Sequence, residues 1–163
     1  MVRPARVEDR AACIAMAAEF SQTTDYRAFP VSLEQLGLLF DVLTGLEQEA
    51  DPLGAILVAE VEGRVVGMIC LALVPHLLTG LPYVDEVAWW VTPTHRSGTV
   101  GPRLRKAAED WGVQNRASMI RMVAPCGSDV GRHYRRCGYL EVETAFWKPL
   151  TWPDSQLPSR SSA

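Results

Sequence analysis

A stretch of small residues between a strand-like run and a helix-like run is the first place in this sequence where chemistry could occur. Its members are Arg96, Ser97, Gly98, Thr99, Val100 and Gly101. Small residues leave backbone N–H groups uncovered at a helix N-terminus, where unpaired donors and the helix dipole attract phosphate. Arg96 could add a positive charge. The pattern predicts an anion site, although an ordinary strand–turn–helix with a Gly-containing loop fits the same residues.

Two adjacent carboxylates, Asp85 and Glu86, interrupt the apolar run that precedes this loop. Because side chains alternate along a strand, the two should point to opposite faces. Burial would raise the pKa of the carboxylate that faces inward and bring it toward the range of a general base. If this end of the strand is exposed instead, both carboxylates are solvated and neither has that role.

The elements that position these residues lie on both sides of the loop. Residues 84–91 are rich in β-branched and aromatic side chains, which favours a mostly buried strand that Pro93 ends. Pro102 suits the first turn of a helix, where its missing N–H has no cost. Apolar residues then recur at helical spacing. They are Val100, Leu104, Ala107 and Trp111. The loop should therefore join a central strand to an amphipathic helix.

The rest of the chain alternates between strand and helix patterns. Strands are predicted at residues 2–7, 55–61, 64–73, 118–124 and 139–147, and helices at residues 9–20, from Ser32 onward, and at 129–137. The order β-α-α-β-β-β-α-β-α-β predicts an α/β (α+β) fold, a mixed central sheet with helices on both faces. We expect one domain over residues 1–150 and a disordered C-terminal tail over residues 151–163.

The connections follow local signals. Glu62-Gly63 predicts a hairpin turn between two strands, and Ser32 and Gln35 have the spacing of a helix capping box. Residues 21–30 and 45–54 read as loops. Residues 75–82 break the sheet, and Leu77 and Leu78 in that loop are expected to pack on the core, the alternative being an apolar substrate cleft.

Composition bounds the class of protein. The chain has 163 residues, 48% of them hydrophobic and 21% charged, as in one globular domain. Its net charge of −3 argues against a dedicated nucleic-acid binder that relies on a broad positive surface. The four cysteines form no C-x-x-C pair, so no zinc site or disulfide framework is predicted, and reduced thiols favour a cytoplasmic location. No apolar run approaches transmembrane length, so we expect no membrane partner.

Two motifs resemble those of the GNAT superfamily of acyl-CoA N-acyltransferases. The segment Val91-x-Pro93-x-x-Arg96-x-x-Thr99-x-Gly101 is similar to the acyl-CoA signature of that family, and residues 133–139, HYRRCGY, are similar to its Tyr-x-x-x-Gly helix. The likeness spans roughly residues 2–148. It implies a GNAT-like sheet and an N-acetyltransferase without a metal. Such an enzyme transfers an acetyl group from acetyl-CoA to a primary amine by direct attack in a ternary complex.

The resemblance also implies roles for individual residues. In the family the loop, here residues 96–101, holds the CoA pyrophosphate, and the strand before it, here at Trp89 and Val91, pairs through its backbone with the pantetheine arm. The helix tyrosine lies beside the CoA sulfur, so Tyr134 is the candidate acid that protonates the leaving thiolate. A Glu on the strand often acts as the base, which favours Glu86, with Asp85 or a water as alternatives.

Two departures from the family pattern motivate a rival interpretation. Thr99 stands where the family usually has Gly, and Gly127 and Ser128 stand where relatives commonly have an Asn. The rival is a non-catalytic CoA-binding or regulatory domain of the same fold, and a nucleotide-binding α/β domain is a third hypothesis. The acceptor segments carry no transferable signature. We expect a small-molecule or peptide amine, and a homodimer through the last strands is a further hypothesis.

Overall fold

Five strands form one mixed sheet in the computed structural model, which describes residues 1–45, 53–148 and 150. They are β1 (Val2–Pro4), β2 (Gly54–Val61), β3 (Arg64–Pro75), β4 (Pro82–Val91) and β5 (Ile120–Arg121). The strands lie in this order across the sheet. Strands β1 to β4 pair antiparallel with their neighbours, and β4 pairs parallel with β5. The predicted mixed α/β sheet is confirmed.

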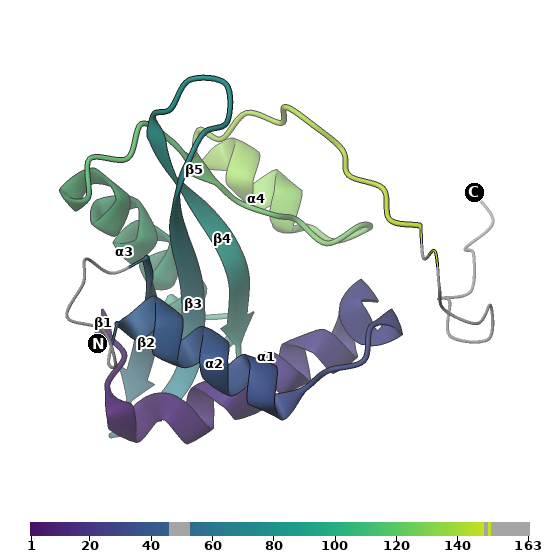
Figure 1. Cartoon of the computed structure of the whole chain (residues 1–163). Coiled ribbons are helices and arrows are strands. Elements are labelled where there is room, and N and C mark those ends of the chain that lie inside the picture. The colour runs from purple at the N-terminus through teal and green to yellow at the C-terminus, as the bar shows by residue number, and fades with distance from the viewer. Residues whose placement is uncertain (46–52, 149, 151–163) are drawn as a thin grey trace.

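Helices cover the two faces of this sheet. They are α1 (Arg10–Thr23), α2 (Leu33–Thr44), α3 (Val100–Gln114) and α4 (Val130–Arg136), with short 3-10 turns at Val7–Asp9, Asp25–Ala28 and Pro93–His95. Helices α1 and α2 pack on one face, where Met16 and Phe40 meet Met68 and Trp90. Helix α3 packs on the other face through Leu104. Figure 1 shows α1 and α2 crossing the sheet together.

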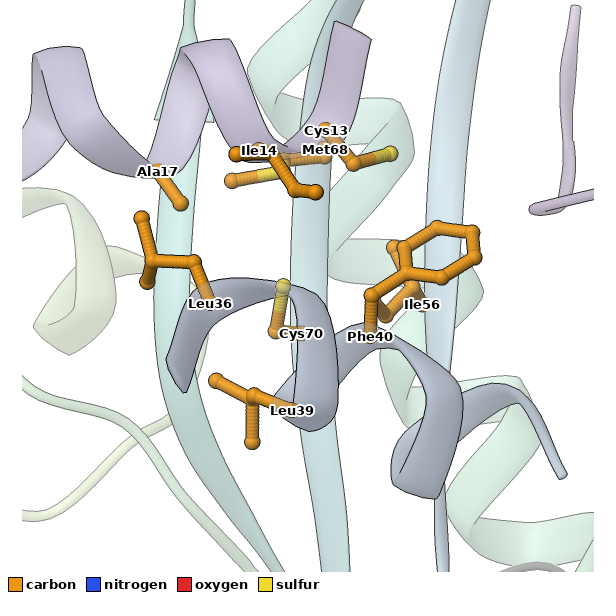
Figure 2. A pocket seen from close by; sticks show the side chains of 9 residues that line it. All are labelled: Cys13, Ile14, Ala17, Leu36, Leu39, Phe40, Ile56, Met68 and Cys70. Atoms are coloured by element: carbon orange, nitrogen blue, oxygen red, sulfur yellow. The ribbon is translucent and has the colours of Figure 1, made fainter. Parts of the chain in front are cut away.

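A small cavity lies between α1, α2 and the sheet. Its volume is about 20 Å³, and its wall is apolar except for the thiols of Cys13 and Cys70 (Figure 2). Burial raises the pKa of both thiols, so they stay protonated at neutral pH. A space of this size holds at most one water molecule, and an apolar wall gives such a water no partners. This face of the sheet is therefore a closed core.

Local sequence signals account for the ends of several elements. The Ser32 hydroxyl accepts a hydrogen bond from the Gln35 amide at the start of α2 (3.3 Å), as the predicted cap requires. Gly45 ends the same helix with a positive φ of 67°. Glu62 and Gly63, at φ 49° and 74°, make the hairpin turn between β2 and β3. The hairpin prediction is confirmed, and of the predicted capping box the structure shows the bond from the Gln35 amide to the Ser32 hydroxyl.

Two predicted strands differ from the structure. The strand predicted at residues 118–124 shortens to Ile120–Arg121, and no strand forms at residues 139–147. A strand needs a neighbour of matching length. Residues 139–147 lie beside β5, because Glu143 forms an ion pair with Arg121 on that strand. Strand β5 is only two residues long, so it offers too short a neighbour. Most of the predicted linker at 45–54 and the whole predicted tail at 151–163 lie outside the described residues.

The loop between β3 and β4 is also unlike the prediction. Leu77 and Leu78 are 98% and 90% exposed, so they neither pack on the core nor line a cleft. Instead, the loop forms a compact turn in which the Gly80 amide donates to the His76 carbonyl. Its tip projects beyond the sheet, as Figure 1 shows at the end of the β3–β4 hairpin. No helix in the described part of the chain has the length and apolarity to cross a membrane.

Candidate functional site

The sheet opens between β4 and β5. The two strands pair only at Val84 with Ile120 and at Asp85 with Arg121. Beyond these pairs the chain that follows β5 leaves β4 and turns toward α4 (Figure 1). The second half of β4 therefore has a strand partner on the β3 side only, among the residues that the structure describes. An edge of this kind offers backbone donors and acceptors to an extended ligand.

Glu86 lies at the point where the strands separate. The pairing of β4 with β3 jumps from Leu71–Glu86 to Cys70–Ala88, so Val87 is an extra residue that bulges from the strand. Glu86 is 8% exposed, and its Oε2 accepts a hydrogen bond from the Val123 amide across the gap (2.8 Å). The carboxylate thus holds the chain after β5 at the point where the two strands separate.

The pKa of Glu86 is raised to about 7, chiefly because the carboxylate is buried and also because of the nearby charge of Asp85. The Val123 amide, the Tyr134 hydroxyl and Arg121 act in the opposite direction. Asp85 has a different environment. Its carboxylate forms an ion pair with Arg121 (3.1 Å) and is partly exposed. The two carboxylates therefore have different surroundings, as strand alternation predicted, and Glu86 is the one suited to exchange a proton near neutral pH.

Tyr134 on α4 is buried beside Glu86. Its hydroxyl donates to the Val123 carbonyl (3.3 Å) and also interacts with the Glu86 carboxylate. Burial, followed by the charge of Glu86, raises the pKa of Tyr134 far above its ordinary value. The side chain is thus a neutral donor held against a carboxylate.

The Trp89 ring connects this pair to the start of α3. The ring stacks on Tyr134 with centroids 6.0 Å apart and an interplanar angle of 25°. On another side it approaches Gly101, where an added Cβ would lie 3.3 Å from Cζ2 of the indole. The indole N–H is buried and has no hydrogen-bond partner among the described residues. An unsatisfied buried donor is rare in a folded protein, and sites that bind ligands are one of its explanations.

The predicted anion loop lies at the N-terminus of α3. Residues 96–99 are exposed, and Val100 begins the helix. Within the described chain the amides of Ser97, Thr99, Val100 and Gly101 donate to no backbone carbonyl. Four neighbouring donors at one helix terminus form an arrangement that attracts phosphate oxygens.

Arg96 has a role in the structure that the sequence did not reveal. Its Nε donates to the Val91 carbonyl (2.9 Å), and its guanidinium lies 4.1 Å from the centre of the Trp90 ring. Trp90 in turn donates its indole N–H to Glu19 on α1 (3.1 Å). Arg96 therefore fixes the loop to the end of β4, with its guanidinium over the Trp90 ring.

Comparisons with known proteins give the family of this chain. The sequence model of the acetyltransferase (GNAT) family matches residues 18–139, which is most of the chain. The chain belongs to the GNAT acetyltransferase family. The matched residues include β4, the loop, α3 and Tyr134, so membership covers the features described above. Comparison with curated protein sequences gave no significant match.

Solved GNAT structures share this fold at low sequence identity. A ribosomal-protein-alanine N-acetyltransferase from Brucella melitensis biovar Abortus 2308 is 18% identical with a TM-score of 0.68, covering 92% of this chain and 99% of its own. A putative acetyltransferase from Agrobacterium tumefaciens str. C58 is 17% identical with a TM-score of 0.71 and the same coverage. An aminoglycoside acetyltransferase from an uncultured soil metagenomic sample, in complex with sisomicin, is 16% identical with a TM-score of 0.69, covering 93% of this chain and 96% of its own.

The departures of this GNAT chain from the family pattern lie on the surface of the site. Thr99 is exposed, and its side chain makes no capping hydrogen bond to the first turn of α3. Gly127 has a positive φ of 70°, and Ser128 donates its hydroxyl to the Pro125 carbonyl (2.7 Å) in the turn before α4. Thr99 and Ser128 therefore both lie outside the Glu86–Tyr134 pair.

Several basic side chains of α3 and α4 are paired with carboxylates. On α3, Arg105 contacts Glu109 and Lys106 contacts Asp110. On α4, the arginines at positions 132 and 135 are paired with Asp129 and Glu141. The backbone amides are thus the main feature of the loop that favours an anion. Among the described residues no group of three or more His, Cys, Asp or Glu side chains could hold a metal ion.

The structure joins residues that the sequence named separately and adds one that it missed. Glu86, Tyr134 and Trp89 meet in one cluster, and Gly101 touches its edge. The missed participant is Val123, whose backbone N–H and C=O bind Glu86 and Tyr134 respectively. No side-chain pattern marks a backbone contact of this kind, because any residue at that position offers the same groups.

Proposed function

We propose that this GNAT protein is an N-acetyltransferase that moves the acetyl group of acetyl-CoA to a primary amine, by direct attack in a ternary complex. The observation that carries the proposal is that Glu86 and Tyr134 are both buried and both hydrogen-bonded to the backbone of Val123, at the opening of β4 and β5. A carboxylate with a pKa of about 7 and a neutral phenol are the two groups that this reaction needs.

The donor binds along the opening. The pyrophosphate of acetyl-CoA occupies the N-terminus of α3, where the amides of Ser97, Thr99, Val100 and Gly101 are unpaired within the described chain. The pantetheine arm runs along β4 and pairs with the backbone of Trp89 and Val91 as an added strand. This path directs the thioester toward Tyr134, whose ring stacks on Trp89.

The acceptor, as the neutral amine, attacks the thioester carbonyl, and its nitrogen loses a proton to Glu86, directly or through a water, as the new C–N bond forms. The C–S bond then breaks, and Tyr134 gives its proton to the departing CoA sulfur. Glu86 carries the proton taken from the amine and interacts with the Tyr134 hydroxyl, so it can return that proton to the phenolate. Each proton is accounted for, and both groups regain their starting states at the end of the cycle.

The acceptor class rests on the reaction and on the names of fold relatives. One relative is named as an N-acetyltransferase of ribosomal-protein alanine, and another as an aminoglycoside acetyltransferase. These acceptors differ greatly in size. We therefore propose a small-molecule or peptide amine, and a panel of both kinds is the way to identify it.

The test measures thiol release from acetyl-CoA across that panel of amines. We expect amine-dependent release with the wild-type protein. Tyr134→Phe keeps the ring that stacks on Trp89 and removes the acid, so turnover should fall roughly 100-fold or more while acetyl-CoA affinity changes little. Glu86→Gln should lower turnover in a similar way.

Tyr139→Phe is the matched control. It also removes a phenol hydroxyl next to Tyr134, but that hydroxyl donates to Glu109 on α3 (2.8 Å) and not to the proposed site. Its turnover should stay close to wild type. Acetyl-CoA binding by calorimetry without turnover on any amine would overturn the proposal and support a non-catalytic domain.

A further inference from the structure

The first half of the anion loop, residues 96–98, is held by two long backbone hydrogen bonds. The Arg96 amide donates to the Pro93 carbonyl and the Gly98 amide to the His95 carbonyl, each over 3.4 Å. Backbone hydrogen bonds usually have N···O distances of about 2.7–3.2 Å, so these two are weak. The amides that follow can bind one anion together only if the loop keeps its position. A stronger contact must therefore hold it.

The Arg96 side chain provides that contact at the edge of β4 that faces away from β3. Its Nε donates to the Val91 carbonyl over 2.9 Å. The Thr92 amide donates to the Val66 carbonyl on β3 (2.9 Å). Backbone groups of successive residues point to opposite sides of a strand, so the Val91 carbonyl points to the open edge. Arg96 thus closes that edge at the last residue of β4, directly before the loop amides begin.

The Arg96 guanidinium lies on a ring that α1 holds in place. Its Cζ is 4.1 Å from the centre of the Trp90 ring, and Trp90 is only 6% exposed. The Trp90 indole N–H donates to the Glu19 carboxylate (3.1 Å). The next residue of α1, Phe20, meets the indole edge-on, with centroids 6.3 Å apart. Two adjacent residues of α1 therefore set the orientation of the surface on which Arg96 rests.

We propose that Trp90 and Glu19 are positioning residues for the acetyl donor. Glu19 orients the Trp90 ring, the ring orients Arg96, and Arg96 fixes the start of the loop whose amides bind the pyrophosphate. The inference rests on the proposed function, because it takes the pyrophosphate of acetyl-CoA as the ligand of the loop. Helix α1 packs on the face opposite α3, yet it contributes in this way to binding of the donor at α3.

This role differs from simple packing in what it does to two donors. S-acetyl-pantetheine has the thioester and the arm of acetyl-CoA but no pyrophosphate. If Trp90 and Glu19 act through the loop, their loss should weaken acetyl-CoA and leave the shorter donor unaffected. If they only support the core, both donors should lose activity together, because the whole site is then disturbed.

The first test compares kinetics with the two donors at a saturating amine. Glu19→Ala removes the acceptor of the indole N–H, so the KM for acetyl-CoA should rise roughly fivefold with kcat unchanged. Trp90→Phe also offers the guanidinium a smaller ring, and the rise should be roughly tenfold. For both variants kcat/KM with S-acetyl-pantetheine should stay near wild type. Equal losses with the two donors would overturn the proposal.

Two variants on α1 are the controls. Glu19→Gln keeps an oxygen that can accept from the Trp90 indole, so it should recover most of the acetyl-CoA affinity that Glu19→Ala loses. Gln22→Ala shortens an exposed polar side chain one turn further along α1 and should behave as wild type. A Glu19→Gln variant as weak as Glu19→Ala would contradict the hydrogen-bond step.

The second test observes Arg96 in the ligand-free protein. In nitrogen-15 NMR spectra of the wild type, the Arg96 Nε–H signal should exchange slowly with water, because Nε–H is bonded to Val91, and should carry a ring-current shift from Trp90. Glu19→Ala should move this signal and speed its exchange, and Gln22→Ala should not. A signal that is the same in wild type and Glu19→Ala would overturn the positioning role.

The outcomes separate this inference from the proposed function. A wild-type protein that binds acetyl-CoA in calorimetry without turnover would overturn the proposed transfer, and the Kd values of the variants would still test the positioning. An active wild type whose Glu19→Ala and Trp90→Phe variants keep its Kd for acetyl-CoA would overturn the positioning alone.

Discussion

The two faces of the sheet are built from the same strands, but one buries apolar side chains and the other also buries polar groups. Under α1 and α2 the core is apolar, with Phe40 1% exposed and a cavity no larger than a water molecule. On the side of α3 and α4, a carboxylate and a phenol are buried together and the Trp89 indole N–H has no partner among the described residues. The first face is packed for stability, and the second keeps polar groups available for a ligand.

The largest effect should come from breaking the closed face. Phe40→Ala removes a fully buried ring, so the free energy of unfolding should fall by about 3–5 kcal/mol. Turnover per folded molecule should remain near wild type, because this ring lies on the face opposite α3. Denaturant unfolding and an activity assay corrected for the folded fraction measure the two quantities. Leu38→Ala, at a side chain that is 50% exposed, is the control and should cost far less.

The next largest effect concerns the loop on the open face. Gly101→Glu places a Cβ 3.3 Å from the Trp89 ring and a negative charge among the amides that would hold the pyrophosphate. Acetyl-CoA affinity should fall at least roughly 100-fold, or about 3 kcal/mol, by isothermal calorimetry. Gly98→Ala is the control, since an added Cβ there meets nothing closer than the His95 carbonyl oxygen at 3.6 Å. Unchanged affinity in Gly101→Glu would remove the loop from the cofactor site.

Replacing the buried carboxylate should stabilise the open face. The pKa of Glu86 rises from 4.5 to about 7 on folding, so its protonated form favours the folded state. That contribution is complete below pH 4.5 and is lost as the pH rises through 7. Glu86→Gln should thus be more stable than wild type at pH 8, by about 2–3 kcal/mol at most, and gain little at pH 4.5.

Turnover should change with pH in the opposite sense to stability. A base must be ionised to act, so wild-type turnover should rise with pH and reach half of its maximum near 7. Glu86→Gln should lack this rise. A wild-type profile that is flat from pH 6 to 8, measured with a saturating amine, would show that another group accepts the proton.

The smallest effect should come from the cap at the start of α2, on the closed face. Ser32→Ala removes the hydroxyl that accepts from the Gln35 amide at the start of α2, which should cost about 1 kcal/mol of stability. Ser32→Asp keeps an acceptor at the same position and should restore most of the loss. Thermal unfolding of both variants measures the difference, and equal losses would show that the cap contributes nothing.

Much of the site could be predicted because its signals are local. The loop at residues 96–101 follows from small residues between a strand and a helix, and Asp85 and Glu86 were expected on opposite faces from strand alternation alone. Resemblance to the GNAT family directed attention to Tyr134. The environment of Arg96 could not be predicted, because its contacts with Val91 and Trp90 depend on how the loop folds back on β4.

The sequence by itself determined the order of the elements as far as α4, the turn at Glu62-Gly63 and the cap at Ser32, since periodicity and turn chemistry act between residues a few positions apart. Only the tertiary structure decided that Val87 bulges, that Val123 offers its backbone to Glu86 and Tyr134, and that residues 139–147 have no strand beside them. These features depend on which distant segments become neighbours. A carboxylate acquires its pKa, and a strand acquires its partner, only when the chain has closed around it.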